Sequence, residues 1–241
     1  MTPRIVDIWV YLAASPLLGL TITLVAYVGA YWIYERAGFT PLLNPVALAI
    51  IALVVALKAT GTQYQTYFDG AQFVHFLLGP ATVALAIPLY TQLDRVRQLF
   101  VPLVGALIVG SLTAIISAVG IAWALGVSES SLLSLAPKSV TAPIAMGIAE
   151  KIGGVPSLTA VLVVATGVSG AIMAKYVLDA LGIRDHGVRG FAVGVASHGI
   201  GTARAFQVSE QAGAFAGLGM GLNGVVTAIL MPLMLVAWRY F

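Results

Sequence analysis

The side chains in this sequence that could do chemistry are few, and they lie inside long apolar stretches. Arg204 is the clearest of them, because the residues before it are mostly apolar or small. An arginine near the middle of a bilayer costs at least about 2.5 kcal/mol, and such residues usually face a cavity and a partner. We therefore predict that the Arg204 guanidinium binds a carboxylate through paired hydrogen bonds. A structural ion pair with Glu210, or a side chain that snorkels to the interface, is the alternative.

Two glycines just before Arg204 predict an interruption of its helix. Gly199 and Gly201 let the backbone unwind, or let another helix approach closely. If the helix breaks there, the N-terminus of its second half offers free N–H groups and a positive dipole end to an anion. Ser197, His198 and Thr202 lie around the break, and we expect them to add hydrogen bonds to a bound substrate.

A second break is predicted between Pro137 and Pro143, in the run Pro-Lys-Ser-Val-Thr-Ala-Pro. Proline removes a backbone donor and displaces its predecessor from the α region, so this run cannot form an ordinary lipid-facing helix. The freed backbone groups need partners from protein, ligand or water, because lipid offers none. Lys138, Ser139 and Thr141 would make this segment an anion cradle. A surface loop with a snorkelling lysine is the alternative.

A third break is predicted at Gly79 and Pro80, in the first half of the chain. It carries no charge, and Thr82 is its nearest hydroxyl. We expect it to form, with the Gly199 break, a crossed pair of interrupted helices that bind the substrate. A kinked packing helix is the alternative.

Weaker signals come from polar residues in other apolar runs. Asn223 lies in a glycine-rich span, where it either reaches the substrate cavity or makes a hydrogen bond between helices. Lys175 and Asp179 are four residues apart, so they share a helix face and are predicted to pair with each other.

The sequence favours no enzyme. Ser197 and His198 are neighbours, which project about 100° apart in a helix and cannot form a nucleophile–base pair. The 3 histidines form no paired-histidine motif, and there is no cysteine. We therefore expect no catalytic residue, no metal and no cofactor, and the absence of a basic stripe argues against a nucleic-acid partner.

Composition places the whole chain in a membrane. Hydrophobic residues make up 60% of the 241 residues and charged residues only 9%, against roughly 25% charged residues in soluble domains. A span needs roughly 18–20 apolar residues. The charge-free runs that meet this length are 8–34, 37–57, 70–93, 98–128, 152–174 and 211–238. Because alternation of period two is absent, we predict an all-α polytopic protein.

We predict spanning helices near 9–34, 43–59, 71–92, 99–125, 156–181, 188–209 and 213–238. Between the fourth and fifth lies the stretch 128–154, whose longest charge-free run, 139–149, is too short to span. We expect a re-entrant or broken element there. No linker divides the chain, so 1–241 is predicted to be a single membrane domain of about seven spans plus one re-entrant segment.

Short internal matches predict two repeats, 44–125 and 156–238. They share their order along the chain: Pro45 with Pro156, 79–86 with 199–206, and 110–115 with 224–229. Lys and Arg flank opposite sides of the equivalent helices, as expected if the second repeat is inverted. The same bias predicts that 35–42, 93–98, 182–189 and the C-terminus face the cytoplasm. Inverted repeats with interrupted helices at matching positions are typical of secondary transporters.

Three segments give the chain a specific resemblance to the LrgB/CidB family of antiholin-like membrane proteins. They are Leu78-Gly-Pro-Ala-Thr-Val-Ala-Leu-Ala-Ile-Pro-Leu-Tyr90, Pro137-Lys-Ser-Val-Thr-Ala-Pro-Ile-Ala-Met146 and Ser197-His-Gly-Ile-Gly-Thr-Ala-Arg-Ala205. Their order is intact and the likeness covers nearly the whole chain. The family is related to the chloroplast glycolate/glycerate translocator, which looks like an LrgA-type half fused to an LrgB-type half.

The resemblance implies a small 2-hydroxy or 2-oxo carboxylate as cargo, such as glycolate, glycerate, pyruvate or lactate. It also implies a multi-pass protein of the bacterial cell (inner) membrane that works with an LrgA/CidA-type partner, a half that this chain lacks. We expect a homo-oligomer and alternating access, with Lys138 and Arg204 as charge partners for the substrate. The alternative is a holin- or antiholin-type pore, or a regulator of murein hydrolase export and cell lysis.

Overall fold

The computed structural model describes residues 16–84 and 86–239, and its regular secondary structure there is entirely helical. The chain is an all-α polytopic membrane protein with two compact units, Met1–Ala84 and Leu85–Phe241. Within the described residues, five helices are long and apolar enough to cross a bilayer: Leu17–Arg36, Pro41–Thr60, Phe100–Ala124, Pro156–Ala180 and Glu210–Leu235. The predicted count of seven spans stays a prediction, and two of the expected helices are interrupted within the described residues.

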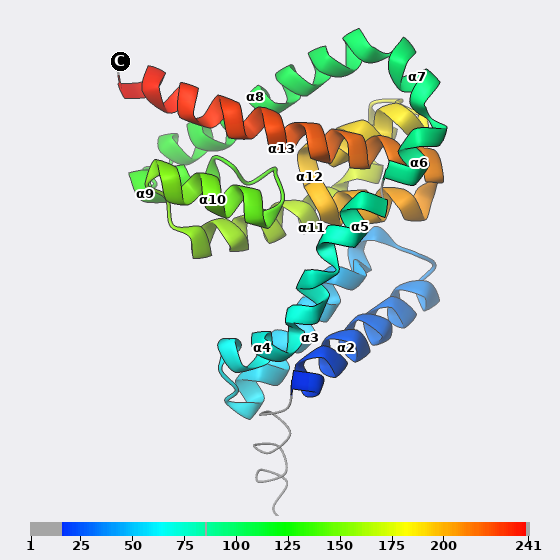
Figure 1. Ribbon diagram of the computed structural model, residues 1–241, viewed down its shortest axis with the longest axis vertical. Helices are drawn as coiled ribbons and strands as arrows, with labels where there is room; N and C mark the ends of the chain where they lie inside the picture. Colours follow the sequence, from blue (N-terminus) through cyan, green and yellow to red (C-terminus); the bar gives the residue numbers. More distant parts are fainter. Residues whose placement is uncertain (1–15, 85, 240–241) are drawn as a thin grey trace, which may run out of the picture. The chain divides into compact units, whose positions relative to one another are not determined.

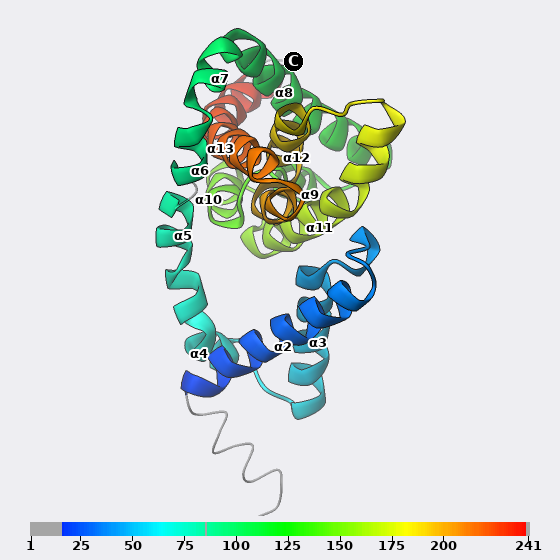
Figure 2. The same ribbon diagram turned by 90° about the vertical axis from the view of Figure 1, so that its right-hand side faces the viewer.

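The first unit is a small helical cluster (Figures 1 and 2). Its helix α2 (Pro16–Arg36) packs against α3 (Pro45–Thr60) and α4 (Tyr64–Phe76). The contact with α4 is close: a Cβ on Gly19 would lie 2.6 Å from the Tyr67 carbonyl oxygen, and the hydroxyls of Thr23 and Tyr67 are 2.8 Å apart. A 3₁₀ turn, η1 (Pro41–Leu43), precedes α3. The first seven residues of the predicted span 9–34 lie outside the described residues.

The predicted single helix 71–92 is interrupted at Leu77, and a proline explains the position of this break. After α4 come α5 (Leu78–Ala84) and α6 (Ala86–Thr91), and α6 belongs to the second unit. Pro80 has no N–H to give to the Phe76 carbonyl, so the helical hydrogen-bond ladder is broken there.

The second unit contains three long helices, α8 (Phe100–Ala124), α11 (Pro156–Ala180) and α13 (Glu210–Arg239). The short helix α7 (Leu93–Gln98) leads into α8. Between the long helices lie α9 (Glu129–Leu135), α10 (Ala142–Ile152) and α12 (His186–Val208). These three shorter helices form two hairpins, which we describe in turn.

The α9–α10 hairpin is the broken element expected in 128–154. After α9 the chain runs without helix through 136–141 and returns through α10. It comes back to where it entered, because a Cβ on Gly154 would lie 2.9 Å from the Ser134 nitrogen. The Ser134 hydroxyl accepts a hydrogen bond from the Val155 N–H at 2.7 Å, and Thr159 donates to the Ser134 carbonyl at 3.0 Å. These contacts fix the base of the hairpin to the start of α11.

The α12 hairpin replaces the predicted span 188–209. His198 has φ 42° and ψ −135°, so the helix does not continue through it. A Cβ on Gly201 would lie 2.8 Å from Val193 Cγ1, although residues eight apart in a straight helix are about 12 Å apart. The returning half, 199–208, therefore lies against the first half, 186–197. α12 turns back at His198 and does not span the bilayer.

The two hairpins enter the unit from opposite ends, as the contacts along α13 show. Near the start of α13, Ala212 faces Gly190 of the α12 hairpin. A Cβ added to Gly190 would lie 2.0 Å from the Ala212 carbonyl oxygen. In its middle, Asn223 binds both hairpin tips. Towards its end, Met231 packs with Ile152 at the base of the α9–α10 hairpin. Helix α11 contacts the two hairpins in the opposite order along the chain. Its start contacts Ser134 at the base of the α9–α10 hairpin, and near its end Asp179 pairs with Arg189 of the α12 hairpin.

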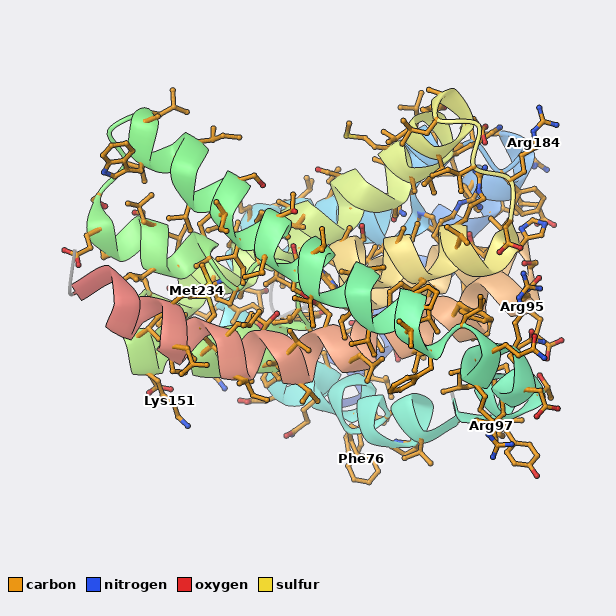
Figure 3. The ribbon with its side chains drawn as sticks, turned by 90° about the horizontal axis from the view of Figure 1, so that it is seen from above. Phe76, Arg95, Arg97, Lys151, Arg184 and Met234 are labelled. Carbon is orange, nitrogen blue, oxygen red and sulfur yellow. The ribbon has the colours of Figure 1, made fainter. Side chains whose placement is uncertain are left out.

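We name the two ends of this unit by labelled residues. Arg95, Arg97 and Arg184 lie at the Arg95 end, and Met234 and Lys151 lie at the Met234 end (Figure 3). Arg95 pairs with Asp185, which places the loops 93–98 and 182–189 together, as predicted. The C-terminal part of α13 lies at the Met234 end, so the predicted placement of the C-terminus beside these loops differs from the structure. The reason is the α12 hairpin, which removes one crossing.

Two further expectations meet the structure here. Asp179 pairs with Arg189 at 2.6 Å, so the predicted pair of Lys175 with Asp179 is wrong. Helices α8 and α13, which carry the matched segments 110–115 and 224–229, both run from the Arg95 end to the Met234 end. Counterparts in inverted repeats run in opposite directions, so the relation between 44–125 and 156–238 gains no support within this unit and stays a prediction.

Asp185 caps the α12 hairpin, and we expect its carboxylate to stabilise the fold. Its Oδ1 accepts a hydrogen bond from the Val188 N–H at 2.9 Å; this bond, with the charge of Arg95, holds the pKa of Asp185 below its usual value. Asp185→Ala should lower the free energy of unfolding by about 1 kcal/mol, mainly through the lost cap, since solvent screens the exposed ion pair. A lowered pKa means that the stabilisation is present above the unfolded pKa, about 3.9, and is lost as the pH falls through the folded pKa.

Thermal unfolding of purified protein at pH 7 and at pH values below 4 checks this. Asp94→Ala is the matched control, because Asp94 is 92% exposed and pairs only loosely with Arg97 at 3.5 Å. An equal loss of stability in both variants at pH 7 would contradict the role assigned to Asp185.

Candidate functional site

Asn223 is the centre of a buried polar cluster in the second unit. Its Nδ2 donates to the Ser139 carbonyl at 3.1 Å and to the Val195 carbonyl at 2.9 Å. Its Oδ1 accepts from the Ser111 hydroxyl at 2.5 Å and from the Thr227 hydroxyl at 3.4 Å. The hydrogen-bonding capacity of the amide is therefore used within the protein. Of the two readings left open for Asn223, the structure shows the bond between elements.

The tip of the α9–α10 hairpin holds Lys138, Ser139 and Thr141. Ser139 is buried, and Lys138 is half-buried with its Nζ 3.3 Å from the Ser139 hydroxyl. Thr141 is the N-cap residue of α10, but its side chain makes no capping hydrogen bond. Pro137 directly follows the C-cap of α9 and Pro143 lies in the first turn of α10, so the two prolines bracket the non-helical segment.

The tip of the α12 hairpin is held against α11 by His198. The imidazole is 3% exposed, and its Nε2 lies 2.9 Å from the Val163 carbonyl. Because a carbonyl can only accept, Nε2 carries a proton in this contact. Gly167 makes room for the ring, since a Cβ there would lie 2.6 Å from its Cε1. The positive φ falls on His198 and not on Gly199, and φ 42° with ψ −135° is a backbone conformation that residues with a side chain rarely adopt.

Ser197 and Thr202 complete this tip. A Cβ on Gly170 would lie 1.8 Å from the Ser197 hydroxyl oxygen, so Ser197 fills a notch in α11. The Thr202 hydroxyl donates to the His198 carbonyl at 2.8 Å, which satisfies a backbone group freed by the reversal. Gly201 lies at the crossing of the two halves of α12, where only a residue without a side chain fits.

Arg204 lies on the returning half of α12, two residues beyond Thr202. It is half-buried, and its Nη1 donates to Gln207 Oε1 at 3.1 Å. Arg204 therefore lies more than one helical turn beyond the reversal at His198, whereas Lys138 lies within the tip of its own hairpin. Its predicted contact with substrate stays a prediction.

Gly79, Pro80 and Thr82 lie in α5, in the first unit. The chain is interrupted just before Gly79, at Leu77, and both Gly79 and Pro80 are exposed within that unit. The side chain of Thr82 lies outside the described residues. The predicted meeting of this break with the Gly199 break is a prediction about the two units together.

The two hairpin tips create a positively charged environment. The segments 136–141 and 197–202 contain Lys138 and no carboxylate. Met220 lies against the start of the returning half of α12, 3.9 Å from a Cβ on Gly199. Gly224 lies against Ile144 in the first turn of α10. Met220 and Gly224 are four residues apart on α13, which is about 6 Å along its axis. The N-termini of both helices therefore approach α13 near the same point, and their positive dipole ends favour an anion.

An apolar groove at the Met234 end is a poor alternative site for an anion. Its cavity is about 450 Å³, and its lining includes one charged residue, Glu129, which would repel a carboxylate. The other lining residues are apolar: Ile115, Ile116, Val119, Gly120, Trp123, Leu132, Leu133, Ala136, Met231, Met234 and Leu235.

Several residues of the cluster carry no signal of function in the sequence. Ser111 is 2% exposed and donates to Asn223, and Gly167 and Gly170 shape α11 around the tip of the α12 hairpin. A serine or glycine in an apolar helix is common, so nothing in their spacing predicts these contacts. The match of 110–115 with 224–229 was the one hint that these segments belong together.

Comparison with known proteins now adds to the geometry. The family model described as the LrgB-like family matches residues 23–237, which is most of the chain. The chain belongs to the LrgB-like family. It is 37% identical over 228 residues to YxaC of Bacillus subtilis (strain 168), covering 95% of this chain and 98% of that protein.

Relatives with a functional name are somewhat more distant. The antiholin-like protein LrgB of Bacillus cereus (strain B4264) is 30% identical over 220 residues, covering 91% of this chain and 95% of that protein. The antiholin-like protein LrgB of Bacillus anthracis (strain CDC 684 / NRRL 3495) matches to the same extent. No solved structure matches. The resemblance seen in the three sequence segments is thus confirmed at the level of the family.

Proposed function

We propose that this protein is a secondary transporter, or a transporter subunit, of small carboxylates. The observation that carries the proposal is the meeting of two hairpin tips from opposite ends, with Lys138 in one tip and no carboxylate in either. Broken helices whose N-termini face an anion near the middle of the protein are typical of secondary transporters. Glycolate, glycerate, pyruvate and lactate are the candidates, as the family resemblance implies.

The residues take distinct roles in this proposal. Lys138 supplies the charge, and the free N–H groups at the starts of α10 and of residues 199–208 supply hydrogen bonds. Ser139, Thr141, His198 and Thr202 lie at the tips and would add hydrogen bonds to the substrate, while Ser197 and Asn223 hold the tips in place. A hairpin at each end gives the site a separate route to each side of the bilayer, as alternating access requires.

The second candidate is an antiholin-like regulator or pore, which the names of the Bacillus relatives favour. A pore is expected to show polar residues along a helix stripe. In the second unit most of the buried polar residues gather instead around the two tips, and Ser134 and Thr159 lie at the base of the α9–α10 hairpin. An LrgA/CidA-type membrane protein is the proposed partner in either case, and we propose the bacterial cell membrane as the location.

Uptake into proteoliposomes tests the proposal. Labelled glycolate, pyruvate and lactate should each be compared with and without an LrgA-type partner and a pH gradient, alongside release of a trapped anionic dye. A carrier gives saturable uptake that unlabelled substrate competes, and no dye release. Non-saturable passage together with dye release would support the pore instead.

Arg204 offers an independent test of which cation binds substrate. Arg204→Lys keeps the charge but loses the planar fork, so it should weaken carboxylate binding about 10- to 100-fold, as expected for a charge-assisted hydrogen bond of about 1.5–3 kcal/mol. Binding to purified protein and thermal unfolding should be measured together. Unchanged binding in Arg204→Ala would remove Arg204 from the site.

A further inference from the structure

The hydrogen bonds of Asn223 join two hairpins that are separate in the chain. The two protons of one NH₂ group go to two different hairpins, to Ser139 of one and Val195 of the other. Because both protons belong to one planar amide, rotation that follows one hairpin breaks the bond to the other.

The orientation of this amide is itself fixed. Ser111 on α8 donates to Oδ1 at 2.5 Å, and Thr227 on α13 donates to the same atom. A flipped amide would turn Oδ1 towards the two carbonyls and leave both hydroxyls without an acceptor. Asn223 is 1% exposed, so water does not compensate.

Each hairpin also has its own attachment to the rest of the unit, at its own end. The α9–α10 hairpin is attached through Ser134 to Val155 and Thr159, and the α12 hairpin through Asp185 to Arg95. Movement of one hairpin about its base would open the tips towards one end only. Asn223 is the described side chain that hydrogen-bonds to both hairpins.

We propose that Asn223 is a positioning residue that holds the two hairpins as coupled gates, one for each end of the unit. The purpose of these gates rests on the proposed function, whereas the experiment that tests their coupling does not depend on it. While Asn223 bridges both tips, both routes are closed. Loss of the Asn223 amide removes both hydrogen bonds and therefore releases both hairpins at once.

The test uses the absence of cysteine from the chain. One reporter thiol is placed on each hairpin beside its tip, Ala142→Cys in α10 and Ile200→Cys in α12, where both residues are half-buried. A third reporter, Ala122→Cys on α8, detects general loosening, since Ala122 is buried at 8% exposure away from the tips. The rate of labelling by a small charged methanethiosulfonate is measured in purified protein and needs no substrate.

Asn223→Leu, of similar size but without hydrogen bonds, should raise the labelling rate at both hairpin reporters at least tenfold and leave Ala122→Cys unchanged. A rise at one hairpin only, or at neither, overturns the proposal, as does an equal rise at all three reporters. If Asn223→Leu does not fold, Ser111→Ala decides, because it removes only the bond that orients the amide. It should raise both hairpin rates in parallel, and unequal or absent changes would overturn the inference.

The control and the second readout separate this inference from the proposed function. Thr227→Val removes only the longer contact at 3.4 Å and should change neither rate more than about twofold. Parallel release of both hairpins in a protein without carboxylate uptake would leave the coupling intact and reject the transporter. Saturable carboxylate uptake together with unequal changes in the two labelling rates would support the transporter and reject the coupling of the hairpins.

Discussion

Gly194→Ala should unfold the protein or lower its free energy of unfolding by about 3 kcal/mol or more. An added Cβ would lie 2.0 Å from the Ala216 carbonyl oxygen and 2.7 Å from its carbonyl carbon. Both are backbone atoms of α13, so no side chain can rotate away and the two helices must separate. Gly190 faces Ala212 in the same way four residues earlier, and the double variant should not fold.

Gly105→Ala on α8 is the matched control, because no atom lies within 4 Å of its added Cβ. Alanine is the better helix former by about 1 kcal/mol, so this variant should be as stable as the wild type or slightly more so. Size-exclusion chromatography and thermal unfolding in detergent check both variants. A Gly194→Ala protein that unfolds at the wild-type temperature would show that α12 and α13 do not pack as described.

Lys138→Met should abolish carboxylate uptake at low substrate concentration while the protein stays folded. Methionine keeps the length of the side chain and removes the charge, so the lost charge-assisted hydrogen bond should weaken binding about 10- to 100-fold. Relief of a half-buried charge should leave stability unchanged or raised. Uptake and thermal unfolding of the same preparation separate these two effects.

Lys151→Met is the control for charge alone. Lys151 lies on the same hairpin in the last turn of α10, exposed and at the Met234 end (Figure 3). Its removal should leave uptake as it is in the wild type. If both lysine variants take up carboxylate equally well, Lys138 is a snorkelling residue and not a ligand.

The breaks themselves could be predicted from the sequence, because proline and glycine act locally. Pro80, Pro137 and Pro143 lack the N–H that a helix needs, and a non-helical residue lies within three positions of each. The prolines at 45 and 156 both begin helices, as expected. The long apolar helices α3, α8, α11 and α13 follow from hydropathy in the same way.

The direction of the chain after a break could not be predicted, since it depends on distant contacts. Continuation and reversal are both open to a helix broken before Gly199. The reversal falls on His198 because α11 offers it a carbonyl and the space at Gly167, and offers Ser197 the space at Gly170. The predicted span 188–209 contains Arg189 and Arg204, and its helix is not among those that are long and apolar enough to cross a bilayer. The error then carried over to the expected position of the C-terminus.

The cluster around Asn223 also combines a feature that the sequence predicts with contacts that only the fold determines. Its buried amide was visible in the sequence, but the partners Ser111, Ser139 and Val195 lie 112, 84 and 28 residues away. Nothing local links such positions. The sequence could therefore indicate which residues were costly to bury, while the fold decides which of them support the site and which face a substrate.

The central claim is that a carboxylate binds between the hairpin tips, and protection of a single cysteine tests it most directly. Thr141→Cys places a thiol at the N-cap of α10, where the native side chain makes no capping bond. Saturating pyruvate, lactate or glycolate should slow its alkylation by a maleimide several-fold, with half-protection at the concentration that half-saturates uptake. Ser157→Cys, exposed near the start of α11, should be alkylated at the same rate with and without carboxylate. Saturable uptake with no protection of Thr141→Cys would contradict the claim and place the substrate elsewhere.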